Sequence, residues 1–145
     1  MSQGEGRILA LDLGSRRIGL ALSDELGVTA QGLPTLQRKT REQDIDALSA
    51  IATQHRVGQI VVGHPVNMNG GEGPRARQAE RFAHTLHKRL AVPVVLWDER
   101  LTTRQARRVL KESGASIEKR AKAIDRMAAI LILQGYMDFQ QAAQA

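Results

Sequence analysis

The sequence predicts an α/β domain built on a mixed five-stranded sheet. Its 145 residues suit a single domain, expected to span residues 1–145. Three closely spaced apolar runs at the start predict an antiparallel meander. Helix and strand then alternate, which predicts parallel strands joined by right-handed crossovers. Cysteine is absent, which excludes disulfides, thiolate metal sites and a cysteine nucleophile.

Strands are predicted where short apolar runs end at turn residues. The first two runs are separated by Gly-Ser-Arg-Arg at 14–17, which is typical of a tight hairpin turn. Pro34 makes the third strand an edge strand or a bulged one. The later runs, QIVVG and VPVVLW, are apolar throughout, which is typical of strands buried on both faces. The predicted strands are 8–13, 18–23, 30–37, 59–63 and 92–97.

Helices are predicted from caps and from apolar residues at helical spacing. Thr40 and Thr102 each precede a glutamine by three residues, which forms a capping box, and Pro74 suits the first turn of a helix. After a loop at 113–120, the last helix is apolar on most sides, so we expect it to pack against the sheet. The predicted helices cover about 40–55, 74–90, 102–112 and 122–142.

Carboxylates fall at the ends of predicted strands. Asp12 ends the first strand, and Asp98 and Glu99 end the last, so they can share the rim where parallel strands end. Asp125 lies in the final helix beside a basic run. Three converging carboxylates repel each other unless cations lie between them, and their hard oxygens suit Mg²⁺ or Mn²⁺. Two such ions about 4 Å apart activate a water and stabilise the leaving oxygen of a phosphodiester. This pattern favours a two-metal-ion nuclease.

Each acid also has a structural role open to it. Asp12 can accept hydrogen bonds from the turn at 14–17, and Asp98 can cap the following helix or pair with a nearby arginine. Asp125 can pair with Lys122 in its own helix. Their coincidence at one rim is what favours the metal site.

The charge balance indicates an anionic partner. Lysine and arginine number 21 against 15 acidic residues, a net charge of +6, which favours nucleic acid over an acidic protein surface. Aromatic residues make up 3% of the chain, so we expect contacts to phosphates rather than base stacking. The alternative is a solvated basic face. The candidate phosphate ligands follow Asp12, lie in the glycine-rich loop at 64–74 and the helix after it, or follow Glu99: Arg16, Arg17, Asn67, Arg75, Arg100, Arg104 and Arg108.

Four segments of the chain resemble the signatures of the YqgF/RuvX family. They are DLGSRRIGLALSD, VVGHPVNMNGGEGPRA, VPVVLWDERLTT and IDRMAAILILQGYMD, in the family's order. The resemblance implies the ribonuclease H-like fold of Holliday junction resolvases, with sheet order 3-2-1-4-5 and helices on both faces. It also implies a nuclease that processes the 5′ end of precursor 16S rRNA in ribosome biogenesis. The metal ligands that it implies are Asp12, an acid of the Asp98–Glu99 pair, and Asp125.

One departure from the wider resolvase pattern concerns the second acid. Related resolvases carry it at the end of the fourth strand, where this chain has Gly63-His64-Pro65. The acid is then expected from the fifth strand, roughly 10 Å from Asp12 at the backbone. Glu99 has a longer reach than Asp98 and is favoured, and Glu72 in the glycine-rich loop is a further candidate. The predicted catalytic residues are Asp12, Glu99 and Asp125.

Three other functions stay open at this point. The first segment also resembles the phosphate loop of actin-like ATPases, but 145 residues are too few for the second lobe of such an enzyme. A Holliday junction resolvase acting on branched DNA would need a dimer to cut two symmetric strands, so monomer and homodimer both stay open. The third alternative is a non-catalytic module that binds nucleic acid or the ribosome.

The start of the chain and its longest apolar runs bear on location. The first residues, MSQGEGR, contain no apolar signal core, and no apolar run approaches the length of a membrane span. We therefore expect a cytoplasmic protein without a membrane partner. Precursor rRNA is the favoured nucleic acid, and branched DNA is the alternative.

Overall fold

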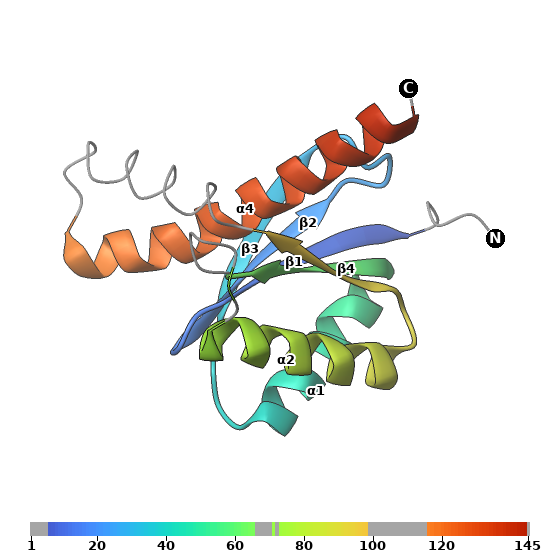
Figure 1. Ribbon diagram of the computed structural model, residues 1–145. Coiled ribbons are helices and arrows are strands. Elements are labelled where there is room, and N and C mark those ends of the chain that lie inside the picture. Colours follow the sequence, from blue (N-terminus) through green and yellow to red (C-terminus); the bar gives the residue numbers. More distant parts are fainter. Residues whose placement is uncertain (1–5, 66–70, 72, 99–115, 145) are drawn as a thin grey trace.

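A computed structural model of the chain describes residues 6–65, 71, 73–98 and 116–144, with residues 117–126 and 144 described by their backbone alone. Five strands form one sheet in the order β3-β2-β1-β4-β5 (Figure 1). β1 pairs antiparallel with β2 and β2 with β3, whereas β1, β4 and β5 are parallel. The predicted order 3-2-1-4-5 is therefore confirmed. The strands are β1 (Arg7–Leu13), β2 (Arg17–Ser23), β3 (Ala30–Gln37), β4 (Val57–His64) and β5 (Val94–Asp98).

The strands follow the apolar runs closely. β3 lies at an edge of the sheet and contains Pro34, which lacks the N–H that a central strand would need for its ladder. Its pairing with β2 shifts register between Ile18 and Leu20. β4 lies between β1 and β5, and its central residues 59–63 are all buried. The edge position of β3 and the burial of β4 on two faces are confirmed. The expectation that the run at 92–97 is also buried on both faces is wrong, because β5 lies at the other edge of the sheet and is only partly buried.

Two helices connect the later strands. In α1 (Arg41–Gln54) the Thr40 hydroxyl accepts a hydrogen bond from the Gln43 backbone N–H at 3.1 Å, and the Gln43 side chain accepts one from the Thr40 N–H at 3.2 Å. This is the predicted capping box. α2 (Pro74–Leu90) begins with its proline and ends before Ala91, which has a left-handed conformation with φ of 56°.

The last helix, α4 (Ile117–Gln144), is longer than predicted. The loop expected at 113–120 is wrong over its second half, because the helix begins at Ile117. Residues 118–120 are Glu-Lys-Arg, which have good helix propensity. The helix predicted at 102–112 lies outside the described residues. None of the helices that the structure describes is both long and apolar enough to cross a membrane.

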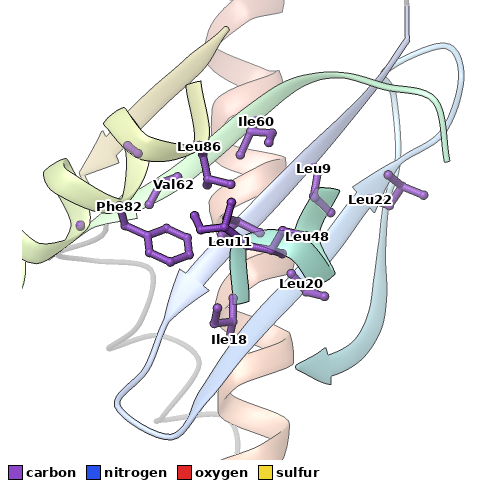
Figure 2. Packing of buried hydrophobic residues seen from close by; sticks show 13 residues of the cluster. Leu9, Leu11, Ile18, Leu20, Leu22, Leu48, Ile60, Val62, Phe82 and Leu86 are labelled. Carbon is purple, nitrogen blue, oxygen red and sulfur yellow. The ribbon is translucent and has the colours of Figure 1, made fainter. Parts of the chain in front are cut away.

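The helices cover both faces of the sheet (Figure 1). α1 and α2 pack on one face through a group of buried residues that we call the α1/α2 cluster. Figure 2 shows Leu48, Phe82 and Leu86 of these helices lying over Leu9, Leu11 and Val62 of the strands. The buried members of the α1/α2 cluster are Leu9, Leu11, Ile18, Leu20, Leu22, Ile45, Leu48, Ile60, Val62, Ala79, Phe82, Ala83 and Leu86. α4 packs on the other face through the α4 cluster. The prediction of helices on both faces is confirmed. The buried members of the α4 cluster are Ala10, Ala21, Val61, Ala129, Ile132, Leu133, Tyr136 and Met137.

Candidate active site and nucleic-acid interface

Asp12 lies at the carboxyl end of β1 and is half-buried. Leu11, the residue before it, belongs to the α1/α2 cluster, and Ala10 belongs to the α4 cluster. Because side chains alternate along a strand, Asp12 lies on the face that α4 covers. Its partner on β2 is Gly19, so no side chain stands directly opposite the carboxylate on that strand.

Arg17 is the first residue of β2 and lies on the same face as Asp12. It precedes Gly19 by two residues, which makes it the diagonal neighbour of Asp12 across the β1–β2 pair. The Cβ atoms of diagonal neighbours are about 7–8 Å apart, a distance that an arginine side chain can span. The backbone therefore brings Arg17 to the side of Asp12, as the sequence predicted.

The turn between β1 and β2 is held from two directions. Arg38, just after β3, donates from Nη1 to the Gly14 carbonyl at 2.8 Å, and its backbone N–H donates to the Arg16 carbonyl at 2.9 Å. Arg75, in the first turn of α2, donates from Nη2 to the Leu13 carbonyl at 3.3 Å. These contacts fix the backbone on which Arg16 and Arg17 stand, while the Arg16 side chain is exposed.

Arg38, which holds the turn, is itself bound by a buried carboxylate of α1. Asp44 of α1 is only 2% exposed and accepts hydrogen bonds from Arg38 Nε at 3.3 Å and from the Lys39 backbone N–H at 2.8 Å. This pair was not predicted from the sequence. The available signal was an aspartate four residues before Leu48, on the apolar stripe of the helix, with an arginine six residues earlier to neutralise it.

The end of β5 places Asp98 away from Asp12. Trp97 packs in the α4 cluster, so alternation puts the following Asp98 on the α2 side of the sheet. Asp98 pairs in register with His64 of β4, whose Nε2 lies 3.3 Å from Oε2 of Glu80 in α2. By strand alternation, Asp98 and Asp12 thus belong to opposite faces of the sheet.

Asp125 lies in the amino-terminal half of α4. It precedes Ala129 by four residues and Ile132 by seven, and both belong to the α4 cluster. The helical repeat therefore puts its Cα on the stripe of α4 that faces the sheet. In Figure 1 this half of α4 lies toward the same end of the sheet, on the left, as the carboxyl ends of β1 and β4.

The remaining predicted residues lie outside the described part of the chain, and the metal site stays a prediction. Within the residues that the structure describes, no group of three or more His, Asp or Glu is close enough together to hold a metal ion. The expected set needs Glu99 and the Asp125 side chain in addition to Asp12. The residues outside the description are Asn67, Glu72, Glu99, Arg100, Arg104 and Arg108.

Comparisons with known sequences agree with the motifs. The pattern of the family described as RuvX, Holliday junction resolvase, matches residues 6–139. A protein of Koribacter versatilis named pre-16S rRNA nuclease is 51% identical over 133 residues, which cover 92% of this chain and 87% of that protein. A protein of Geobacillus kaustophilus with the same name is 52% identical over 134 residues, covering 91% of this chain and 97% of that protein.

A comparison with solved structures concerns the fold. The structure of T. thermophilus RuvC in complex with Holliday junction substrate is 12% identical, with a TM-score of 0.55, and the match covers 94% of this chain and 96% of that one. At this identity the likeness shows the fold alone. The ribonuclease H-like fold implied by the sequence motifs is thereby confirmed.

Proposed function

Because this chain belongs to the RuvX family, we propose that it is a metal-dependent nuclease that processes the 5′ end of precursor 16S rRNA. The observation that carries the proposal is the juxtaposition at the end of β1. Asp12 and Arg17 lie on one face of the sheet, and the backbone of α4 carries Asp125 along the stripe that covers that face. The names of the relatives supply the substrate.

We place the divalent cations at the carboxyl end of β1, held by Asp12, Glu99 and Asp125. Asp12 fits this role, because it offers hard oxygen ligands from a half-buried position at the carboxyl end of the central strand, opposite a glycine. The placement of Asp98 on the α2 side favours Glu99 over Asp98 as the second acid. When bound, one or two Mg²⁺ or Mn²⁺ ions would activate a water and stabilise the leaving oxygen of the phosphodiester.

Arg17 is proposed to orient the phosphate that is cut. A guanidinium presents a planar fork of N–H groups that matches two phosphate oxygens. Since Arg38 and Arg75 hold the β1–β2 turn, the backbone of Arg17 is positioned before the substrate binds. This positioning lowers the entropy cost of aligning the phosphate with Asp12.

Substitution of Asp12 tests the proposal most directly. With Mg²⁺ or Mn²⁺, we expect Asp12→Asn to lower the cleavage of a precursor rRNA 5′ leader by at least about a hundredfold, the scale of losing one preorganised electrostatic group. Asp138→Asn is the matched control, because Asp138 is exposed near the other end of α4. Circular dichroism and thermal unfolding of both variants establish that the fold is kept.

The same assay distinguishes the alternatives. Chelator should stop cleavage by the unmodified protein, and cutting that persists in Asp12→Asn would remove the metal site proposed here. Binding without cutting under every condition would favour a non-catalytic module.

Holliday junction resolution is the second candidate function, and the family description favours it. A resolvase cuts two symmetric strands, so junction cleavage would have to be accompanied by a homodimer. A four-way DNA junction assayed beside the rRNA leader and plain single strands separates the two substrates. Preference for the leader would support rRNA processing, which takes place in the bacterial cytoplasm.

A further inference from the structure

A cleft opens at the carboxyl end of β1 on the α1/α2 side of the sheet. Its volume is 540 Å³, within the range of pockets that hold small ligands. The β1–β2 turn forms one wall through Gly14, Pro65 after β4 forms part of another, and the first turns of α1 and α2 complete it. The arginines of its described lining are Arg38, Arg41, Arg75 and Arg81.

The charge of this cleft is strongly positive. Its described lining contains four arginines and no acidic residue. The nearby Asp44 offsets one of these charges through its pair with Arg38. Arg41 and Arg81 make no side-chain hydrogen bond or ion pair with any residue that the structure describes. Two arginines of the lining therefore have no anionic partner among those residues.

The cleft and the Asp12 site lie on opposite faces of the sheet. Leu13 lines the cleft, whereas Asp12, one residue earlier, lies on the α4 face. A phosphate in the cleft is therefore separated from the Asp12 site by the thickness of the sheet. It would belong to a nucleotide further along the strand than the one that is cut.

We propose that this cleft binds a backbone phosphate of the nucleic-acid substrate, with Arg41 and Arg81 as its principal ligands. The inference rests on the proposed function, which identifies the bound nucleic-acid strand as precursor rRNA. It deepens that function by extending the contact surface round the β1–β2 turn. Arg38 and Arg75 connect the two sites, because each binds a carbonyl of the β1 end while lining the cleft.

The chemistry recognised here is a phosphate oxyanion, which has two sources. Arginine forks bind phosphate bidentately whether it is free or part of a strand. The position of the cleft beside the end of β1 favours a phosphate of the nucleic-acid strand over free phosphate. Free inorganic phosphate is the other source, and it forms a separate arm of the test.

The test measures binding of a single-stranded precursor rRNA leader by fluorescence anisotropy, in chelator, over about 50 to 200 mM salt. The slope of log K against log salt is negative, and each lost phosphate contact lowers its magnitude by about 0.7 for a single strand. We expect Arg81→Ala to lower the slope by that amount, Arg41→Ala to act similarly, and Arg81→Lys to keep most of it. Arg7→Ala is the matched control, because it removes the same charge at the opposite end of β1.

The outcomes separate this inference from the nuclease proposal. An unchanged slope in Arg41→Ala and Arg81→Ala, or an equal fall in Arg7→Ala, would overturn it. Inorganic phosphate whose binding is lost in Arg81→Ala, with no change in the RNA slope, would assign the cleft to the free anion and also overturn it. The binding test does not depend on cleavage. If the protein never cuts in the cleavage assay but the salt dependence of binding falls in Arg81→Ala, the phosphate-binding cleft stands and only the nuclease proposal is removed.

Discussion

On β1 and β2, the two faces of the sheet present buried side chains of very different size. Toward α1 and α2, the strands present leucine, isoleucine and valine, which interlock with Leu48, Phe82 and Leu86 of the helices (Figure 2). Toward α4, the buried residues of β1 and β2 are Ala10 and Ala21, while β4 and β5 present the larger Val61, Val95 and Trp97. Gly19 and Gly63 continue this second face beside Asp12.

The difference assigns the two faces different tasks. Large side chains on the α1/α2 face bury the most apolar surface and contribute most of the stability. Small side chains on the other face let a helix lie close to the sheet, and α4 brings Ala129 of its own to meet them. Close packing of α4 is what places the backbone of Asp125 over the face that carries Asp12. We infer that one face stabilises the fold while the other assembles the site.

The largest stability effect is expected on the α1/α2 face. Leu48 is fully buried, so Leu48→Ala removes three buried side-chain carbons and leaves a cavity. We expect it to lower the free energy of unfolding by about 3 kcal/mol, measured by urea denaturation. Leu26→Ala is the control, since Leu26 is 85% exposed and should change stability little. A small cost at Leu48 would contradict the stabilising role of this face.

Overpacking the α4 face should cost less stability and more activity. Ala10 is fully buried against α4, and Ala10→Leu has no space for its extra carbons without moving the helix. We expect a loss of about 2 kcal/mol in urea denaturation. Cleavage by the folded fraction should also fall, because α4 carries Asp125. Ala50→Leu, on the exposed side of α1, is the control for the added side chain. Full activity in Ala10→Leu would show that the site does not depend on how closely α4 packs.

The smallest effect concerns the polar contact of the α4 face. The buried amide of Gln59 in β4 donates to the Tyr136 hydroxyl of α4 at 2.6 Å. Tyr136→Phe leaves this amide without that acceptor and should cost about 1.5 kcal/mol in thermal or urea unfolding. The double variant Gln59→Leu with Tyr136→Phe should recover most of the loss, since neither polar group is then left buried. No recovery would mean that the cost comes from the other partner of the hydroxyl, the Gln140 side chain, which donates to it at 2.8 Å.

Local sequence patterns were enough to predict most of the elements. The Thr40 capping box, Pro74 at the start of α2 and Pro34 in an edge strand are each decided by a few neighbouring residues. The start of α4 was misplaced, because a charged run suits both a loop and a helix. The full family resemblance, rather than these local patterns, supplied the strand order and the precursor rRNA substrate.

Part of the candidate site could likewise be predicted from local sequence patterns, and part of it could not. Asp12 and Arg17 could be predicted as neighbours because a tight turn fixes which residues of a hairpin lie side by side. The cleft of Arg38, Arg41, Arg75 and Arg81 could not be predicted, because its arginines come from two segments far apart in the sequence. The side of the sheet on which Asp98 falls also depends on the strand register.

The sequence by itself determined the elements, the acids at their ends and the basic charge, because propensity, capping and turn chemistry act over a few residues. The tertiary structure alone decided which faces those residues share. Strand register and the packing of α4 against small side chains depend on contacts between distant segments. Those contacts put α4 over the face of Asp12 and Arg17 and assembled the arginine cleft on the other face.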